Sequence, residues 1–298
     1  GKASYREGAI PPQESRRTPE QHEHESIHGQ EIWERMQQDP SFLPSRDQAV
    51  AVVHRSLGGG DSGRLLYIAE RKDDHPEEAA FLNAQLLNGG RELRHVREVL
   101  NAEYIRALGD YFVQRISAYG GTTEHPTVLL EVGSGDGRLV HFLKEYLDTK
   151  IPGQFTIIAT DSGKAAVGTR FPVEQADYTD ALQAHQPTIV ISSWMPQGVD
   201  FSQGMRNTAS VQEYILIGET DGGACGHTWE TWGVPDWDNE DPGEDYSQAP
   251  YEKDGFQRED LDDVSKNQVS RTDDFDSHDP KNGSVSRTVS FRRVVEAV

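Results

Sequence analysis

The chain has almost no cysteine, no long apolar run and a shortage of basic residues. Its 298 residues include one cysteine, Cys225, which excludes an internal disulfide and makes a zinc site unlikely to form from cysteine ligands. No run of about 18 apolar residues and no signal-peptide pattern occurs, so we expect a cytoplasmic protein without a membrane segment. Hydrophobic residues make up only 35% and mean hydropathy is -0.71, which predicts sizeable loops or tails.

The scarcity of bases limits the partners that the protein can bind. Lys and Arg total 29 against 50 Asp and Glu, a net charge of -21. Affinity for nucleic acid depends on neutralising phosphates, so a DNA or RNA substrate is disfavoured. Residues 236–279 hold 16 acids against 4 bases, together with prolines and glycines. This composition predicts an exposed acidic loop inserted late in the chain.

A glycine-rich turn follows directly on a buried-strand pattern. Val128 to Val132 are rich in apolar and β-branched residues, and Arg138 to Leu147 continue with helical spacing. Between them, Gly133, Gly135 and Gly137 lack a Cβ, so the backbone can approach a ligand closely at the start of a helix. Strand, turn and helix in this order predict a nucleoside-binding site.

The acidic residues around this turn indicate which nucleoside it binds. Glu131 ends the strand and Asp136 lies in the turn, so both would repel a pyrophosphate. A cationic ligand without phosphates suits the site better. An NAD-linked oxidoreductase is the alternative, weakened by Asp136 and by the absence of a Tyr-x-x-x-Lys pair.

These residues resemble the first motif of the class I S-adenosylmethionine-dependent methyltransferases, acidic-x-Gly-x-Gly-x-Gly. The resemblance covers roughly Asn101 to Gly233 and the closing strands. It implies an α/β fold, a Rossmann-like doubly wound seven-stranded sheet with an antiparallel last strand, and S-adenosyl-L-methionine as cofactor. Glu131 would then act on the cofactor's ammonium group, directly or through water.

Further cofactor contacts follow from the same resemblance. Asp161, at the end of the next apolar run, would bind the two ribose hydroxyls, and Asp177 would reach the adenine amino group. The cofactor-binding set that the resemblance implies is Glu131, Gly133, Ser134, Gly135, Gly137, Asp161, Asp177 and Ser193.

The fourth apolar run ends in Ser193 to Pro196, where amino-directed members of the family often have Asn/Asp-Pro-Pro-Tyr/Phe. Here the polar residue is Ser, the aromatic residue has moved to second place, and one proline remains. Exocyclic-amine chemistry is therefore in doubt. Trp194 is predicted either to stack on a planar acceptor or to lie in the core beneath the sheet.

The loop after the fifth apolar run, Val211 to Gly218, is rich in polar and aromatic residues. Loops at this edge line the ligand crevice of parallel sheets, so Glu219, Asp221 and His227 are candidates for the site. Trp229 and Trp232 would share a face if a helix starts near Thr228. The predicted catalytic residues are Trp194, Glu219 and His227, and the predicted substrate-binding residues are Tyr104, Trp194, Pro196, Asp221, Trp229 and Trp232. No ligand spacing supports a metal site.

The remaining segments suggest how the chain is organised. We expect a disordered leader at 1–30, a helical cap at 31–120, and a methyltransferase domain at 121–298 with the acidic insertion at 236–279. Alternating residues at Gln268 to Thr272 and Ser284 to Val295 predict an antiparallel strand pair that closes the sheet.

The sequence therefore predicts a methyltransferase that acts on a small molecule, with an amine nitrogen as one acceptor. A protein methyltransferase acting on a basic polypeptide is the second hypothesis, since the acidic loop could recruit such a partner. The third hypothesis is a methyltransferase-fold subunit that has lost turnover.

Overall fold

The computed structural model describes residues 19–56, 97–164, 170–235, 243–270, 273 and 286–294. Its core is a seven-stranded sheet in the order β3-β2-β1-β4-β5-β7-β6. All neighbouring strands are parallel except β7, which is antiparallel to β5 and to β6. The strands are β1 (Thr127–Val132), β2 (Phe155–Asp161), β3 (Glu174–Gln175), β4 (Ile189–Ser193), β5 (Glu213–Glu219), β6 (Phe256–Asp260) and β7 (Ser286–Arg293). This arrangement confirms the predicted fold.

The central strands form where the chain is apolar on both sides of the backbone. In β1, Leu129 faces one layer of helices and Leu130 the other, and neither is exposed to solvent. Leu129 pairs with Ile157 of β2 and with Ile189 of β4. A parallel sheet covered on both faces selects such continuous apolar runs, which is why the sequence marked these strands clearly.

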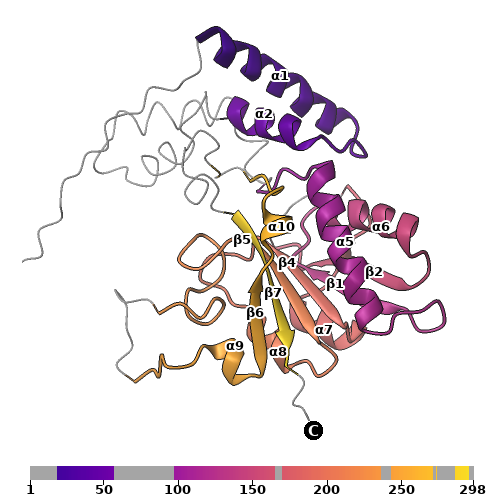
Figure 1. Ribbon diagram of the computed structural model, residues 1–298, viewed down its shortest axis with the longest axis vertical. Coiled ribbons are helices and arrows are strands. Elements are labelled where there is room, and N and C mark those ends of the chain that lie inside the picture. Colours follow the sequence, from indigo (N-terminus) through magenta and orange to yellow (C-terminus); the bar gives the residue numbers. More distant parts are fainter. Residues whose placement is uncertain are drawn as a thin grey trace, which may run out of the picture.

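Helices cover both faces of the sheet. One face packs against α5 (Ala102–Ala118), α6 (Arg138–Lys150) and the short α10 (Asp262–Ser265), and α5 and α6 lie side by side (Figure 1). The other face packs against α7 (Tyr178–His185), α8 (Ser202–Asn207) and α9 (Pro250–Lys253). The side chain of Asn101 caps α5 by accepting a hydrogen bond from the Tyr104 N–H. The helix α5, which we expected to belong to a helical cap, therefore forms part of the helical layer on one face of the sheet.

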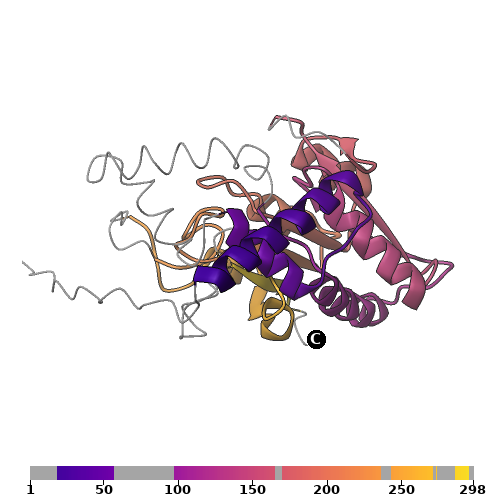
Figure 2. The same cartoon turned by 90° about the horizontal axis from the view of Figure 1, so that it is seen from above.

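A helical hairpin precedes this body of the protein. It consists of α1 (Pro19–Gln38) and α2 (Arg46–Ser56), and lies above the sheet at the end away from α8 and α9 (Figure 1). Seen from above, α1 crosses over the body of the molecule (Figure 2). Trp33, which is 1% exposed, packs in a small core with Val99 and Val269 and so ties the hairpin to the domain.

The hairpin corrects one boundary predicted from the sequence. Residues 19–30 belong to α1, whereas we expected a disordered leader over 1–30. Within the expected cap, the helical spacing of Arg46 to Leu57 agrees with α2. The helical spacing of Glu77 to Leu87 lies outside the described residues. Among the described helices, none is both long and apolar enough to span a membrane.

The closing strands differ from the predicted pair. The strand β7 lies within the predicted range Ser284 to Val295, but its outer partner is β6 rather than Gln268 to Thr272. Ser270 pairs with Glu98 in an isolated bridge. Residues 250–265, part of the expected acidic loop, form α9, β6 and α10. An edge strand whose only buried residue is Phe256 has no apolar alternation, so composition alone suggested a loop.

Candidate functional site

A cavity of about 810 Å³ lies at the carboxyl ends of β1, β2 and β4. This is the edge at which ligands bind in open α/β sheets, and the volume suits a ligand the size of a nucleoside with space for a second molecule. Many of the predicted cofactor residues line it, and so do Arg97 and Glu98, which no motif marked. The lining includes Arg97, Glu98, Leu100, Glu131, Gly133, Ser134, Gly135, Asp136, Arg138, Asp161, Asp177, Tyr178, Ser193, Trp194, Pro196, Val199 and Phe201.

The glycine-rich turn forms the floor of this cavity. Gly133, Gly135 and Gly137 have φ angles of 66°, 59° and 81°, in the left-handed region that favours glycine. A Cβ on Gly137 would lie 2.7 Å from Cγ2 of Val173, so a side chain there would also collide with the chain before β3. The turn thus exposes backbone instead of side chains to a ligand.

Glu131 places a carboxyl group beneath this turn. The residue is 1% exposed, and its Oε2 is buried without a hydrogen-bond partner. Burial raises the pKa of Glu131 well above its usual value, and the neighbouring charges of Asp136 and Asp161 raise it further. The negative charges of Asp136, which pairs with Arg138 at 3.5 Å, and of Asp161 act on this unpartnered oxygen, so the Glu131 carboxyl group offers a place for a cation. An ammonium group of S-adenosylmethionine fits this donor set, whereas a pyrophosphate does not.

Asp161 joins the turn to the end of β2. Its Oδ2 accepts a hydrogen bond from the Gly135 N–H at 2.9 Å, and its Oδ1 accepts one from the Gly163 N–H at 2.7 Å. Each carboxylate oxygen retains a second lone pair, so the group can still receive two hydroxyls. The structure therefore gives Asp161 two roles, since it fixes the turn and lines the cavity.

We expect Asp161→Ala to weaken S-adenosylhomocysteine binding by about 2 kcal/mol, or roughly 30-fold, because a charged hydrogen-bond acceptor is lost. To separate ribose binding from the support of the turn, methylthioadenosine and its 2′-deoxy analogue can be compared by calorimetry. The wild type should prefer the diol, and the variant should bind both equally weakly. A variant that keeps the full preference for the diol would refute the ribose assignment.

Asp177 lies at the amino end of α7. It caps the helix by accepting a hydrogen bond from the Thr179 N–H at 3.3 Å, and Lys164 lies 3.5 Å away. The cap hydrogen bond lowers the pKa of Asp177, with smaller contributions from the Thr179 hydroxyl and Lys164. Because the carboxylate already serves the helix, its adenine contact remains a prediction, although the residue lines the cavity together with Ser134 and Ser193.

Trp194 follows β4 with an unusual backbone. Its φ of 56° lies in the left-handed region, which costs a non-glycine residue on the order of 1 kcal/mol. The backbone N–H donates to the Ile217 carbonyl oxygen at 2.7 Å, and this contact holds the conformation. The ring lines the cavity beside Pro196, with the Arg97 guanidinium 5.7 Å from its centroid. Trp194 also packs against the second core, so its predicted role in stacking on an acceptor or capping the cofactor stays a prediction.

The sequence did not reveal Glu98, which accepts a hydrogen bond from the Trp194 indole N–H at 2.8 Å. Its other donor is the side chain of Gln268, also at 2.8 Å. These neighbours come from segments about 100 and 170 residues further along the chain. No local pattern can mark such a residue, because only the tertiary fold brings the three segments together.

The acidic residues predicted in the loop after β5 do not line the cavity. Glu219 accepts a hydrogen bond from the Ala224 N–H at 2.8 Å within its own loop. Asp221 pairs with Arg258 of β6 at 2.7 Å. His227 is exposed, and its Nδ1 accepts a hydrogen bond from the Glu230 N–H. Each of these groups has a partner that accounts for its position within the protein.

Apart from Trp194, the aromatic substrate-binding candidates are buried away from the cavity. Trp229 is 5% exposed and donates from its indole N–H to Glu244, and Trp232 is 2% exposed and donates to the Cys225 carbonyl oxygen. The segment that carries them forms turns rather than the expected helix. Tyr104 is 1% exposed and its hydroxyl meets that of Thr288. These aromatic residues stabilise the core and do not line the cavity.

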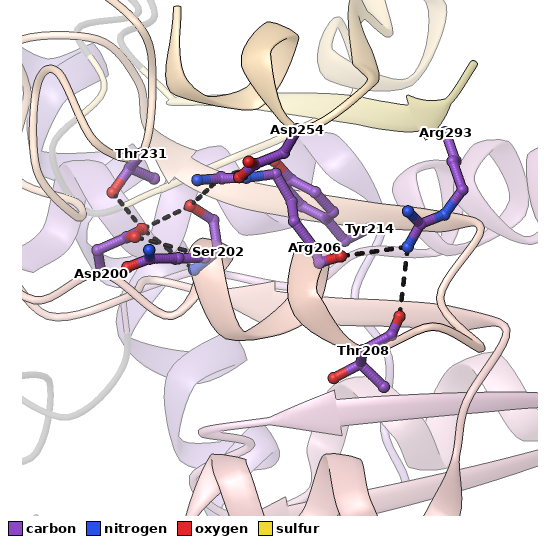
Figure 3. Close-up of polar contacts among 9 residues, drawn as sticks. Asp200, Ser202, Arg206, Thr208, Tyr214, Thr231, Asp254 and Arg293 are labelled. Atoms are coloured by element: carbon purple, nitrogen blue, oxygen red, sulfur yellow. Dashed lines mark hydrogen bonds and ion pairs between the residues drawn. The ribbon is translucent and has the colours of Figure 1, made fainter.

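A cluster of polar side chains connects the loop after β5 to α8 (Figure 3). The Thr231 hydroxyl donates to Asp200 at 2.9 Å, and the Ser202 hydroxyl donates to the same Asp200 oxygen. Arg206, which is 4% exposed, donates to Ser202 at 2.8 Å and pairs with Asp254 at 2.7 Å. Asp200 therefore links α8 to the loop. Among the described residues, no group of three His, Cys, Asp or Glu side chains could hold a metal ion.

No protein-family profile and no curated protein matches the chain. Among solved structures it is similar to the DszA carbon methyltransferase, with 15% identity, 89% of this chain and 70% of that chain covered, and a TM-score of 0.42. It is also similar to the mitomycin 7-O-methyltransferase MmcR, with 12% identity, 85% of this chain and 74% of that chain covered, and a TM-score of 0.32. A third similar structure is human N-acetylserotonin methyltransferase in complex with SAM, with 11% identity, 89% of this chain and 70% of that chain covered, and a TM-score of 0.32. All three are methyltransferases. Identities and TM-scores this low carry no weight for function, which has to be inferred from the cavity itself.

Proposed function

We propose that this protein is an S-adenosylmethionine-dependent methyltransferase that acts on a small-molecule acceptor held against Trp194. The observation that supports this most strongly is the buried, unpartnered oxygen of Glu131 beneath three glycines with positive φ. A cationic nucleoside without phosphates satisfies that carboxyl group and can lie on the bare backbone of the turn.

We propose that one end of the cavity binds the cofactor and the other end binds the acceptor. Glu131 and the glycine turn hold the amino-acid part of the cofactor, and Asp161 holds the ribose. At the other end, Trp194, Leu100 and Pro196 provide an apolar wall for the acceptor. The bound cofactor supplies an electrophilic methyl group. The protein contributes by orienting the acceptor and by excluding water from it.

The test is incubation with S-adenosylmethionine labelled in its methyl group, using separate pools of small molecules and peptides. We expect label in one or more small molecules, and much less label with the Asp161→Ala variant when the cofactor concentration is below the dissociation constant of that variant. Label in the peptide pool alone would instead identify a protein methyltransferase. Absence of label from both pools, with S-adenosylhomocysteine still bound, would contradict an enzymatic role and favour a silent subunit.

A further inference from the structure

A short segment on the far side of the cavity holds Glu98 in place. The Val99 N–H donates to the Val269 carbonyl oxygen at 2.8 Å, and the Asn101 side chain donates to the Asn267 carbonyl oxygen at 2.9 Å. A bridge between Glu98 and Ser270 lies beside these contacts. Three links across four residues fix the backbone of Glu98 opposite Trp194.

The carboxyl group of Glu98 is fixed at one oxygen only. Both the Trp194 indole and the Gln268 amide donate to Oε1. Gln268 is in turn oriented by the Thr288 hydroxyl, which donates to its Oε1 at 2.7 Å and also meets the hydroxyl of Tyr104. This chain of hydrogen bonds fixes the position of Oε1.

The second oxygen of Glu98 is free for a ligand. No described residue donates a hydrogen bond to Oε2. This oxygen is also not one of the fully buried polar atoms that lack a partner, so part of its surface is accessible. Because Glu98 lines the cavity, we take that surface to face the cavity. A carboxyl group held by two donors on one side, with its remaining oxygen open to a cavity, is positioned to receive an N–H or O–H group of a ligand.

From this geometry, and on the basis of the proposed methyltransferase function, we propose that Glu98 is a catalytic residue that binds and deprotonates the methyl acceptor. The acceptor is a neutral or protonated amine, or a hydroxyl compound, with an apolar body. A protonated amine first gives an N–H proton to Oε2, which frees the electron pair on nitrogen for the new bond to the methyl carbon. With a neutral amine or a hydroxyl compound, the N–H or O–H proton passes to Oε2 as the acceptor's lone pair forms that bond. The electron pair of the broken carbon–sulfur bond stays on sulfur, so charge and atoms balance.

The charges around Glu98 suit a base that works close to neutral pH. Burial, together with repulsion from Asp273, raises the pKa of Glu98 to about 8, although the two donated hydrogen bonds oppose the rise. Tyr104 and Cys225 also face this carboxyl group, and the pKa of each is raised, so neither competes for its proton at neutral pH. The Arg97 guanidinium lies over the Trp194 ring, 5.7 Å from its centroid.

The test compares Glu98→Gln with the matched control Glu145→Gln, an exposed position on α6 outside the cavity. With an acceptor identified from the labelled pools, Glu98→Gln should lower kcat by about 100-fold or more. The S-adenosylhomocysteine affinity and the melting temperature of Glu98→Gln should stay close to those of the wild type. The control Glu145→Gln should leave kcat, affinity and melting temperature unchanged. Wild-type turnover should rise with pH to a midpoint near 8, and Trp194→Phe should move that midpoint upward because a hydrogen bond that lowers the pKa of Glu98 is lost.

An independent readout needs no acceptor. In protein labelled with ¹⁵N at its indoles, the Trp194 N–H signal, assigned by its loss in Trp194→Phe, should shift with a midpoint near pH 8 and should not shift in Glu98→Gln. An indole signal with the same pH dependence in wild type and Glu98→Gln would overturn the inference, and so would full turnover by Glu98→Gln. Neither result would contradict the proposed methyltransferase function. If wild type binds S-adenosylhomocysteine but labels no acceptor, the proposed function itself fails, and this inference fails with it.

Discussion

Replacing Glu131 with glutamine should weaken binding of S-adenosylhomocysteine by about 1.5 to 3 kcal/mol, or roughly 10- to 150-fold at pH 7. The variant keeps the size of the side chain but cannot become a carboxylate, so the ammonium group of the ligand loses its counter-charge. Titration calorimetry gives the affinity directly. The exposed Glu174→Gln, on the edge strand β3, serves as a matched control that should bind normally.

The same substitution should change the pH dependence of stability in a defined direction. The pKa of Glu131 is raised in the folded protein, so its protonated form is favoured there. The resulting stabilisation is fully present below the unfolded pKa of about 4.3 and is lost as pH rises through the folded pKa. We therefore expect the stability of the wild type to fall relative to Glu131→Gln as urea unfolding is repeated from pH 5 to pH 8.

Two outcomes would contradict this account of Glu131. Unchanged affinity in Glu131→Gln would show that the carboxyl group does not meet a cation. A wild type that gains stability over the variant with rising pH would show that the carboxylate has a favourable partner in the unliganded protein, contrary to its unpartnered Oε2.

Glu213→Ala should lower the free energy of unfolding by about 3 kcal/mol. Glu213 has no exposed surface and accepts hydrogen bonds from Arg115 at 2.7 Å, Tyr119 at 2.8 Å and Ser290 at 2.8 Å, and also from Tyr111. Removing the carboxylate leaves four donors, one of them the cation Arg115, without their acceptor. Because Arg115 retains some exposure, water can partly replace the lost partner, so the expected effect lies at the lower end of the range for buried pairs.

The cluster around Glu213 lies at the beginning of β5, whereas the cavity lies at the carboxyl ends of the strands. Urea unfolding of Glu213→Ala should therefore show the loss of stability, while calorimetry at low temperature shows unchanged affinity for S-adenosylhomocysteine. Tyr119→Phe, which removes one donor, should cost only about 1 kcal/mol. Equal costs for both variants would mean that the carboxylate has no special role, and a large loss of affinity would mean that the two ends of β5 are coupled.

The parts of the fold that the sequence predicted correctly are those whose physical cause is local. The runs ending in Val132 and Asp161 are apolar because both faces of each strand are covered, and Gly133 to Gly137 follow at once. Burial thus leaves a readable pattern in the central strands. The edge strand β6 buries only Phe256, so no such pattern exists there, and its acidic composition suggested a loop.

The residues that we propose for cofactor binding could be singled out in the sequence for the same reason, since they follow their strands directly. The part of the cavity that we propose for the acceptor could not be identified in this way. Glu98 matters only through Trp194 and Gln268, which lie far away along the chain. The loop after β5 has the residue types of an active site, yet Asp221 pairs with Arg258 and Trp232 is buried, because contacts within the protein use the same polar and aromatic groups that a ligand would.

The central claim is that the cavity binds a cationic, phosphate-free nucleoside through Glu131. Calorimetric titration with S-adenosylhomocysteine, run in two buffers of different ionisation enthalpy and beside a titration with NAD, tests it most directly. We predict a dissociation constant of about 10 μM or lower, proton release on binding as Glu131 ionises, and no binding of NAD. Binding of NAD in place of S-adenosylhomocysteine, or binding of neither, would contradict the account.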